Sequence, residues 1–169
     1  MAGKRDDYLL RAIEELRRMV AAAVQHRDHG QLDQALIAIV SAQEKLFARP
    51  APAFMGLGLD EQLHLLRLGE SPASAREKCL GYAAVLREAG LVYAARDKPE
   101  LAESAYQSAL YVTLTAAIET PSSADELSAS IAELLEHVPV NQLHAPVKAL
   151  LDRLCPSPPT KTPAPRLGL

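Results

Sequence analysis

The chain has 169 residues and a net charge of −3 at pH 7, with 49% apolar but only 4% aromatic residues. Its length suits one domain with a sizeable core, and its apolar share comes mainly from Ala and Leu, which favour helix. The chain lacks the basic excess of a general nucleic-acid-binding protein. Its longest uncharged apolar stretch is far shorter than the roughly 20 residues that cross a bilayer. We therefore expect a helical protein that binds neither nucleic acid nor membranes.

The N-terminal residues and the cysteines indicate the compartment. Residues 1–7 lack the apolar core of a signal peptide. Cys79 and Cys155 are too few for a disulfide framework, and their separation fits no metal motif. We expect a cytoplasmic protein with reduced thiols.

Two helices are predicted before residue 50. The first covers residues 7–27, with Asp6 or Asp7 as its N-cap and Gly30 as its stop. The second covers residues 31–47, and the prolines that follow it close the element. Both carry apolar residues at helical spacing.

Residues 50–72 are less regular. Residues 54–59 predict an ordered apolar loop, and Asp60 is suited to cap a short helix that ends at Leu66. Gly69 predicts a turn before the next helix.

The central helices have strong start signals. Ser71 as N-cap and Pro72 in the first turn open a helix over residues 72–95, with Ser74 and Glu77 as an alternative capping box. A tight turn then places Pro99 at the start of a helix that continues to about residue 118.

Two further helices are predicted before a proline-rich tail. Ser123 and Glu126 form a capping box that opens a helix through His137, and the last helix covers residues 145–154. Residues 155–169 carry five prolines and are expected to be disordered. Residues 1–154 are therefore predicted to form a single all-helical domain.

The helices at 72–95 and 99–118 share a pattern of side-chain sizes at fixed offsets. The seven positions are Leu86, Ala89, Gly90 and Tyr93 on the first helix and Ala102, Tyr106 and Ala109 on the second. This pattern resembles the tetratricopeptide repeat, a helix-turn-helix of about 34 residues. Close crossing of the two helices explains the small residues, Gly90 and Ala102. Leu114 stands where the family usually has Pro, so the second helix is expected to run on.

The first two helices repeat the pattern more weakly. The equivalent residues are Met19, Ala22, Ala23, His26, Ala35, Ile39 and Ala42. The segment between the hairpins does not fit, and Ala-rich hairpins also produce such spacings by chance. We predict an all-α fold of tetratricopeptide-like helical hairpins, about six helices in a right-handed array, with the last two as a closing cap. Residues 7–14 also resemble the opening of a family of uncharacterised bacterial helical proteins, a likeness that supports the fold and implies no function.

No catalytic constellation is found. His26 and His29 are spaced for metal binding, but at a helix end they equally suit interaction with the helix dipole. Cys79 lies on a predicted core face, where a structural thiol is the more common role. We expect no catalytic residues, metal or cofactor, and a non-enzymatic protein.

The tetratricopeptide resemblance implies a concave groove that binds a protein or peptide. The residues it places there are Arg17, Val20, Val24, Arg27, Ala84, Arg87, Leu91 and Ala95. Aliphatic surface with a few arginines suits an extended or helical peptide with acidic flanks. Leu91 stands where the members that bind chaperone tails have Asn.

Several alternatives remain open at the level of the sequence. The groove residues could instead pack against the last two helices or a second copy of the chain, which would make the protein a self-assembling homodimer. A small-ligand-binding or catalytic helical domain is a further alternative. Between Glu119 and His137 the chain has five acids and no Lys or Arg, which is typical of a solvated helix face or, alternatively, of a site for a basic partner.

Overall fold

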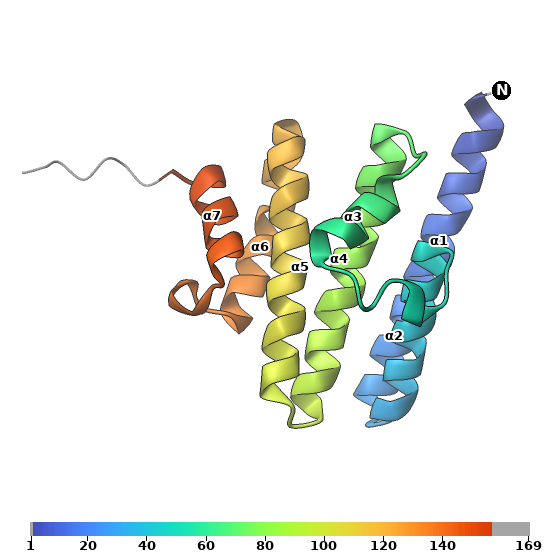
Figure 1. Cartoon of the computed structure of the whole chain (residues 1–169). Coiled ribbons are helices and arrows are strands. Elements are labelled where there is room, and N and C mark those ends of the chain that lie inside the picture. Colours follow the sequence, from blue (N-terminus) through green and yellow to red (C-terminus); the bar gives the residue numbers. More distant parts are fainter. Residues whose placement is uncertain (1, 157–169) are drawn as a thin grey trace, which may run out of the picture.

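The computed structural model describes residues 2–156, with the side chains of residues 7–156 except that of Ser123 (Figure 1). Within these residues it contains seven α-helices, three short 3-10 helices and no strand. The α-helices are α1 (Ala2–Asp28), α2 (Leu32–Phe47), α3 (Leu59–Arg67), α4 (Pro72–Ala95), α5 (Pro99–Glu119), α6 (Ala124–His137) and α7 (Ala145–Leu154). The all-α prediction is confirmed, whereas most of the predicted disordered tail lies outside the described residues.

Most helix ends follow local chemistry. Ser71 Oγ accepts a hydrogen bond from the Ser74 amide at 3.2 Å, and α4 begins at Pro72 as predicted. Gly30 has φ +72°, the left-handed conformation that glycine adopts at least cost, and it follows the end of α1. Pro99 likewise opens α5.

Two predicted caps are wrong. The helix α1 begins at Ala2, so Asp6 and Asp7 lie inside it. Nothing in residues 2–7 forces a later start, because the segment has no proline and water can solvate the free amides of an exposed helix end. The helix α3 begins after Gly58, whose amide donates to Glu61 Oε2 at 2.9 Å, so Asp60 lies in its first turn.

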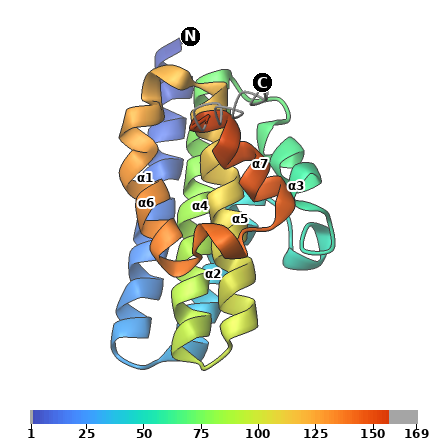
Figure 2. The ribbon, with the colours of Figure 1, turned by 90° about the vertical axis from the view of Figure 1, so that its left-hand side faces the viewer.

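The helices pack in an order that places α4 at the centre. The hairpin of α1 and α2 packs against α4, and α5 packs along the other side of α4 (Figure 1). Both α6 and α7 pack on α5, and Figure 2 shows them on opposite sides of it. The last two helices therefore cover α5 separately, without forming a third hairpin.

Small side chains allow the close approach of α1, α2 and α4. The core between these helices includes four alanines that are almost fully buried, namely Ala23, Ala35, Ala42 and Ala89. A second core, from α3 to α7, holds the larger side chains, such as Leu110 and Leu114. This division explains how a chain with few aromatic residues buries its apolar surface.

The close contact predicted at Gly90 is confirmed. A Cβ atom at Gly90 would lie 2.4 Å from a ring carbon of Tyr106 on the neighbouring helix. Ala102 and Tyr106 are each 4% exposed, whereas Tyr93 is only half-buried. At Gly90, therefore, α4 approaches the ring of Tyr106 on α5 too closely to leave room for a side chain.

The predicted apolar loop packs against α2 and is held by α3. Phe54 is 1% exposed and stacks on Phe47, with their ring centroids 4.2 Å apart. Buried Gln62 donates from Nε2 to the carbonyl oxygens of Phe54 and Leu57, at 3.2 and 2.9 Å. Its Oε1 accepts from the Tyr82 hydroxyl at 2.5 Å, so one amide joins the loop and α3 to α4.

We expect Tyr82→Phe to lower the free energy of unfolding by about 1–2 kcal/mol at pH 7, because Gln62 Oε1 would lose its donor inside the core. Burial raises the pKa of Tyr82 to about 12, whereas a phenol in the unfolded chain ionises near pH 10. Above pH 10 the unfolded state therefore releases the proton first, and the native chain loses stability as the pH rises. Between pH 7 and pH 11 the free energy of unfolding of the wild type should fall by about 1.4 kcal/mol more than that of Tyr82→Phe. At pH 11 the two proteins should therefore be similar in stability. Urea unfolding of both chains at pH 7, 9 and 11 measures this, and a difference that does not change with pH would contradict the prediction.

Candidate interaction groove

A groove runs over α4 between α1 and α6. Figure 2 shows α1 and α6 on the same side of α4, and Figure 1 shows α4 between them. A hollow of about 340 Å³ lies between α1 and α4, and a second of about 160 Å³ lies between α4, α5 and α6. The first is lined by Ile13, Leu16, Arg17, Val20, Glu77, Leu80, Gly81 and Ala84, and the second by Leu80, Ala83, Ala84, Arg87, Thr113, Leu127, Ser130 and Leu134. Because Leu80 and Ala84 line both hollows, the two form one surface, which we call the α1–α4–α6 groove.

The structure brings together four of the eight predicted groove residues. Arg17, Val20 and Ala84 line the larger hollow, while Ala84 and Arg87 line the smaller one. The other four line neither hollow: Val24, Arg27 and Leu91 are half-buried, and Ala95 is exposed.

Sequence reasoning missed the contribution of α6. Leu127, Ser130 and Leu134 line the smaller hollow, and their spacing of three and four residues shows that they share a helix face. The prediction treated this helix as a cap, because its position beside α4 depends on how it folds back over α5. Ile13, Leu16 and Leu80 were missed for a simpler reason, since they lie outside the offsets that the repeat pattern assigns to a groove.

Two of the three predicted groove arginines are already paired. Arg27 Nε donates to Glu88 Oε1 at 2.6 Å, and this hydrogen bond is the main cause that raises the pKa of Arg27. Arg87 forms an ion pair with Glu133 of α6. These ion pairs join α4 to each wall of the groove. Arg17, which is exposed, is the predicted groove arginine that remains without a side-chain partner among the described residues.

An aromatic contact joins α5 to the end of α6. The ring of Tyr106 stacks on the ring of His137, with centroids 4.3 Å apart and an interplanar angle of 8°. Burial is the main cause that raises the pKa of Tyr106, while the nearby charges of Arg87 and Arg27 oppose the shift. The contact explains why Tyr106 is held firmly against Gly90.

The described part of the chain offers no metal site. Within residues 2–156, no group of three or more His, Cys, Asp and Glu side chains is placed to hold a metal ion. His26 Nδ1 contacts Gln31 Oε1 and His29 Nδ1 contacts the Gln25 carbonyl oxygen, each at 2.7 Å, so the two rings have separate partners. Cys79 is buried, which raises the pKa of its thiol, and Cys155 is exposed.

We compared the chain with protein families, curated proteins and solved structures. The chain matches no family model, no curated protein and no solved structure. In the part that the structure describes, no helix has both the length and the apolar character needed to cross a membrane.

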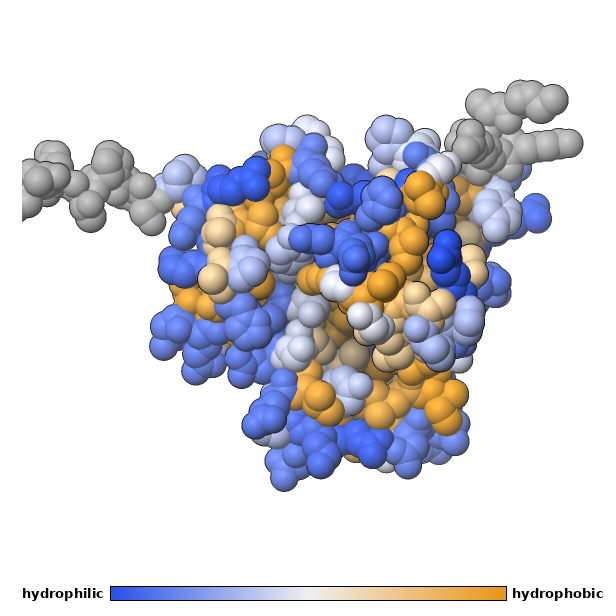
Figure 3. Space-filling model, viewed as in Figure 1, coloured by the Kyte–Doolittle hydropathy of each residue, from blue (hydrophilic) through white to orange (hydrophobic). Residues whose placement is uncertain are grey.

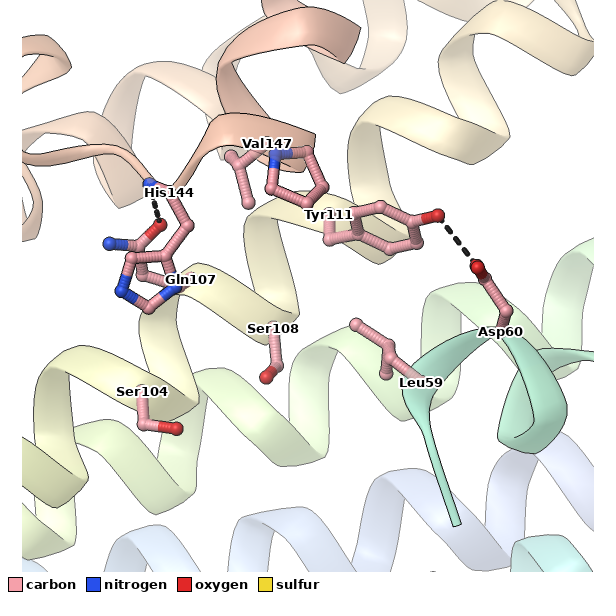
Figure 4. A pocket seen from close by; sticks show the side chains of 9 residues that line it. Leu59, Asp60, Ser104, Gln107, Ser108, Tyr111, His144 and Val147 are labelled. Carbon is pink, nitrogen blue, oxygen red and sulfur yellow. Dashed lines mark hydrogen bonds between the residues drawn. The ribbon is translucent and has the colours of Figure 1, made fainter.

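A third hollow, of about 240 Å³, lies between α3, α5 and α7 (Figure 4). The Tyr111 hydroxyl donates to Asp60 Oδ1 at 2.6 Å, which fastens α3 to α5. Gln107 Oε1 accepts from the His144 amide at 2.9 Å, and its Nε2 donates to the Gln142 carbonyl at 2.9 Å. Because these polar groups hydrogen-bond one helix to another, we assign them a structural role and do not treat this hollow as a binding site.

A further hollow, of about 370 Å³, lies where α3, α4 and α5 meet, and its charged lining residues also form ion pairs. Arg67 Nη2 lies 3.0 Å from Glu119 Oε2, and Lys78 Nζ lies 2.5 Å from Glu70 Oε1. The α1–α4–α6 groove differs from both hollows in its mostly apolar lining. Figure 3 shows the opposite face, where apolar surface gathers over the lower part of α2.

Proposed function

We propose that this chain is a non-enzymatic protein-interaction module that binds a protein or peptide partner in the α1–α4–α6 groove. The observation that carries the proposal is the exposed, small Ala84 between two apolar hollows. Concave apolar surface with a few polar groups at its edge is the usual form of a binding site. The residues that line the groove offer mainly packing surface, together with Arg87, which is paired with Glu133, and the exposed Arg17.

We also propose that α1–α2 and α4–α5 are two tetratricopeptide-like hairpins in a right-handed array. The tight contact between Gly90 and Tyr106 and the burial of Ala102 support this arrangement. The packing of α4 against both α1 and α2 supports it as well. In such an array the first helix of each hairpin lines the binding face, which is where α1 and α4 form the groove.

We expect Ala84→Arg to abolish partner binding, because a long cationic side chain at this position would fill the space between the two hollows. The measurement is affinity capture from the native cell with the wild-type chain, the Ala84→Arg variant and an Ile37→Arg control. Ile37 is 59% exposed on α2 and lies outside the groove residues. Proteins captured by the wild type and the control but lost with Ala84→Arg support the groove, and equal capture by all three chains contradicts it. Thermal melts of the three chains confirm that each is folded.

Self-assembly is the second candidate, and one observation favours it. Tyr8 and Leu10 of α1 are 76% and 59% exposed. Tyr8 also borders a mainly apolar hollow whose lining includes Leu9, Ala12 and Ile13. Light scattering coupled to gel filtration separates the candidates. A dimeric mass that becomes monomeric in a Tyr8→Lys, Leu10→Lys variant favours self-assembly, and a monomeric wild-type mass at micromolar concentration excludes it.

A further inference from the structure

We infer that the partner contributes an amphipathic α-helix that lies along α4, with an acidic flank toward α1 and a basic flank toward α6. The inference rests on the proposed function and names the class of partner for the same groove. It follows from the shape of the groove, from its mostly apolar lining and from the charges along its two edges.

The shape of the groove suits a partner helix that presents two rows of side chains to it. The hollows lie on either side of the turn of α4 that carries Leu80 and Ala84. A helix above Ala84 can approach closely, because that side chain is a single methyl group, and residues three and four apart on it form two adjacent rows. The larger hollow, of about 340 Å³, favours the bulkier row on the α1 side, and the one of about 160 Å³ favours the smaller row on the α6 side.

The groove offers few partners to an extended backbone. Five polar or charged side chains line the two hollows. Thr113 Oγ1 donates to the Ala109 carbonyl and Arg87 is bound to Glu133. This leaves the side chains of Arg17, Glu77 and Ser130 to meet polar groups of a partner, and none of them belongs to the apolar floor at Leu80 and Ala84. An extended peptide pressed against Leu80 and Ala84 would bury amide and carbonyl groups without hydrogen bonds, which is costly. A helix satisfies these groups internally and therefore suits an apolar floor.

The two edges of the groove carry opposite charge. On α1, Arg17 is exposed and has no side-chain partner among the described residues. On α6, Glu126 directly precedes Leu127 of the groove lining, is 73% exposed and has only a 3.6 Å contact to Arg76. The helix α6 has no Lys or Arg. A partner helix is therefore attracted when its acidic side faces α1 and its basic side faces α6.

Designed peptides test this inference directly. The first, of about 18 residues, forms a helix with a Leu row beside a Glu flank and an Ala row beside a Lys flank, long enough to cover the groove. The second peptide differs from the first only in that its Glu and Lys flanks are exchanged. Whichever way its helix points along α4, either its Leu row or its Glu flank then lies on the wrong side of the groove. The third is the first peptide with two central residues replaced by Pro, which prevents a helix. Fluorescence anisotropy measures the dissociation constant of each with the full chain.

The first peptide should bind about tenfold more tightly than either of the others, and Ala84→Arg should abolish its binding. An Arg17→Glu, Glu126→Lys variant, changed only at exposed positions, should reverse the preference between the first two peptides. Equal binding of those two would overturn the charge assignment, and equal binding of the Pro peptide would overturn the helical occupant. If no peptide binds while cellular capture still depends on Ala84, the inference fails and the proposed function stands. If capture is also independent of Ala84, the proposed function fails.

Discussion

Replacing Arg27 by Ala should lower the free energy of unfolding by about 3 kcal/mol or more, because it leaves the carboxylate of Glu88 buried without its cation. Glu88 is 1% exposed, and its Oε1 accepts from Arg27 Nε across 61 residues of sequence. Its other oxygen, Oε2, has no hydrogen-bond partner. Arg27 therefore provides most of the compensation for a charge that water cannot reach. Urea unfolding at pH 7 measures the loss.

Replacing Glu88 by Gln should lower the free energy of unfolding by less than Arg27→Ala does. The side chain of Arg27 is 24% exposed, and its Nη1 lies 3.2 Å from Asp28 Oδ1, so the cation keeps other partners in Glu88→Gln. The guanidinium of Arg27 can then be hydrated or pair with Asp28, whereas the buried carboxylate of Glu88 can do neither when Arg27 is removed. An Arg27→Met, Glu88→Leu double variant should recover most of the stability lost in Arg27→Ala, since both charges are removed together. An Arg27→Ala variant as stable as the wild type would show that the pair contributes nothing.

Gly90→Ala should lower the free energy of unfolding by about 2 kcal/mol, although Ala is the better helix former by about 1 kcal/mol. The added methyl group would lie 2.4 to 2.8 Å from three ring atoms of Tyr106. That ring is 4% exposed and is stacked on His137, so it cannot move aside without disturbing α5 or α6. The overpacking cost therefore exceeds the gain in helix propensity. Thermal or urea unfolding measures the difference.

Gly81→Ala is the matched control on the same helix. Its added Cβ would meet one terminal carbon of Leu16 at 2.4 Å, and the next nearest atoms lie at 3.8 Å. Leu16 borders the hollow of about 340 Å³, so its flexible end can rotate into free space. We expect the stability of Gly81→Ala to stay within about 1 kcal/mol of the wild type, or to rise. If both glycine variants lose the same stability, contact with Tyr106 is not the cause.

Local chemistry made several helix ends predictable from the sequence. Ser71 and Pro72 act within one helical turn, and Gly30 supplies a backbone conformation that few other residues adopt, so each position carries its own signal. The two wrong caps at Asp7 and Asp60 show the limit of this reasoning. A residue able to cap a helix does so only if the helix begins there, and in both places the chain already forms a helix at an earlier residue.

The candidate groove was predictable in part, because the residues on one face of α1 and of α4 follow from helical periodicity. The tetratricopeptide resemblance assigned such a face to the groove, and Arg17, Val20, Ala84 and Arg87 of that assignment line the two hollows. The sequence did not show that α6 forms one wall of the groove. It also did not show that Arg27 and Arg87 are held in ion pairs. Arg27 and Glu88 are 61 residues apart, and Arg87 and Glu133 are 46 apart, so no local pattern connects them.

The sequence by itself determined the helical class, most helix boundaries and the need for a small residue where Gly90 meets Tyr106. These properties follow from the spacing and size of neighbouring residues. Only the tertiary structure decided which charges pair, where α6 and α7 pack, and that an apolar groove remains over Ala84. Those properties depend on the crossing of helices that are distant in sequence, and the side chains that meet there are selected by the geometry of the whole fold.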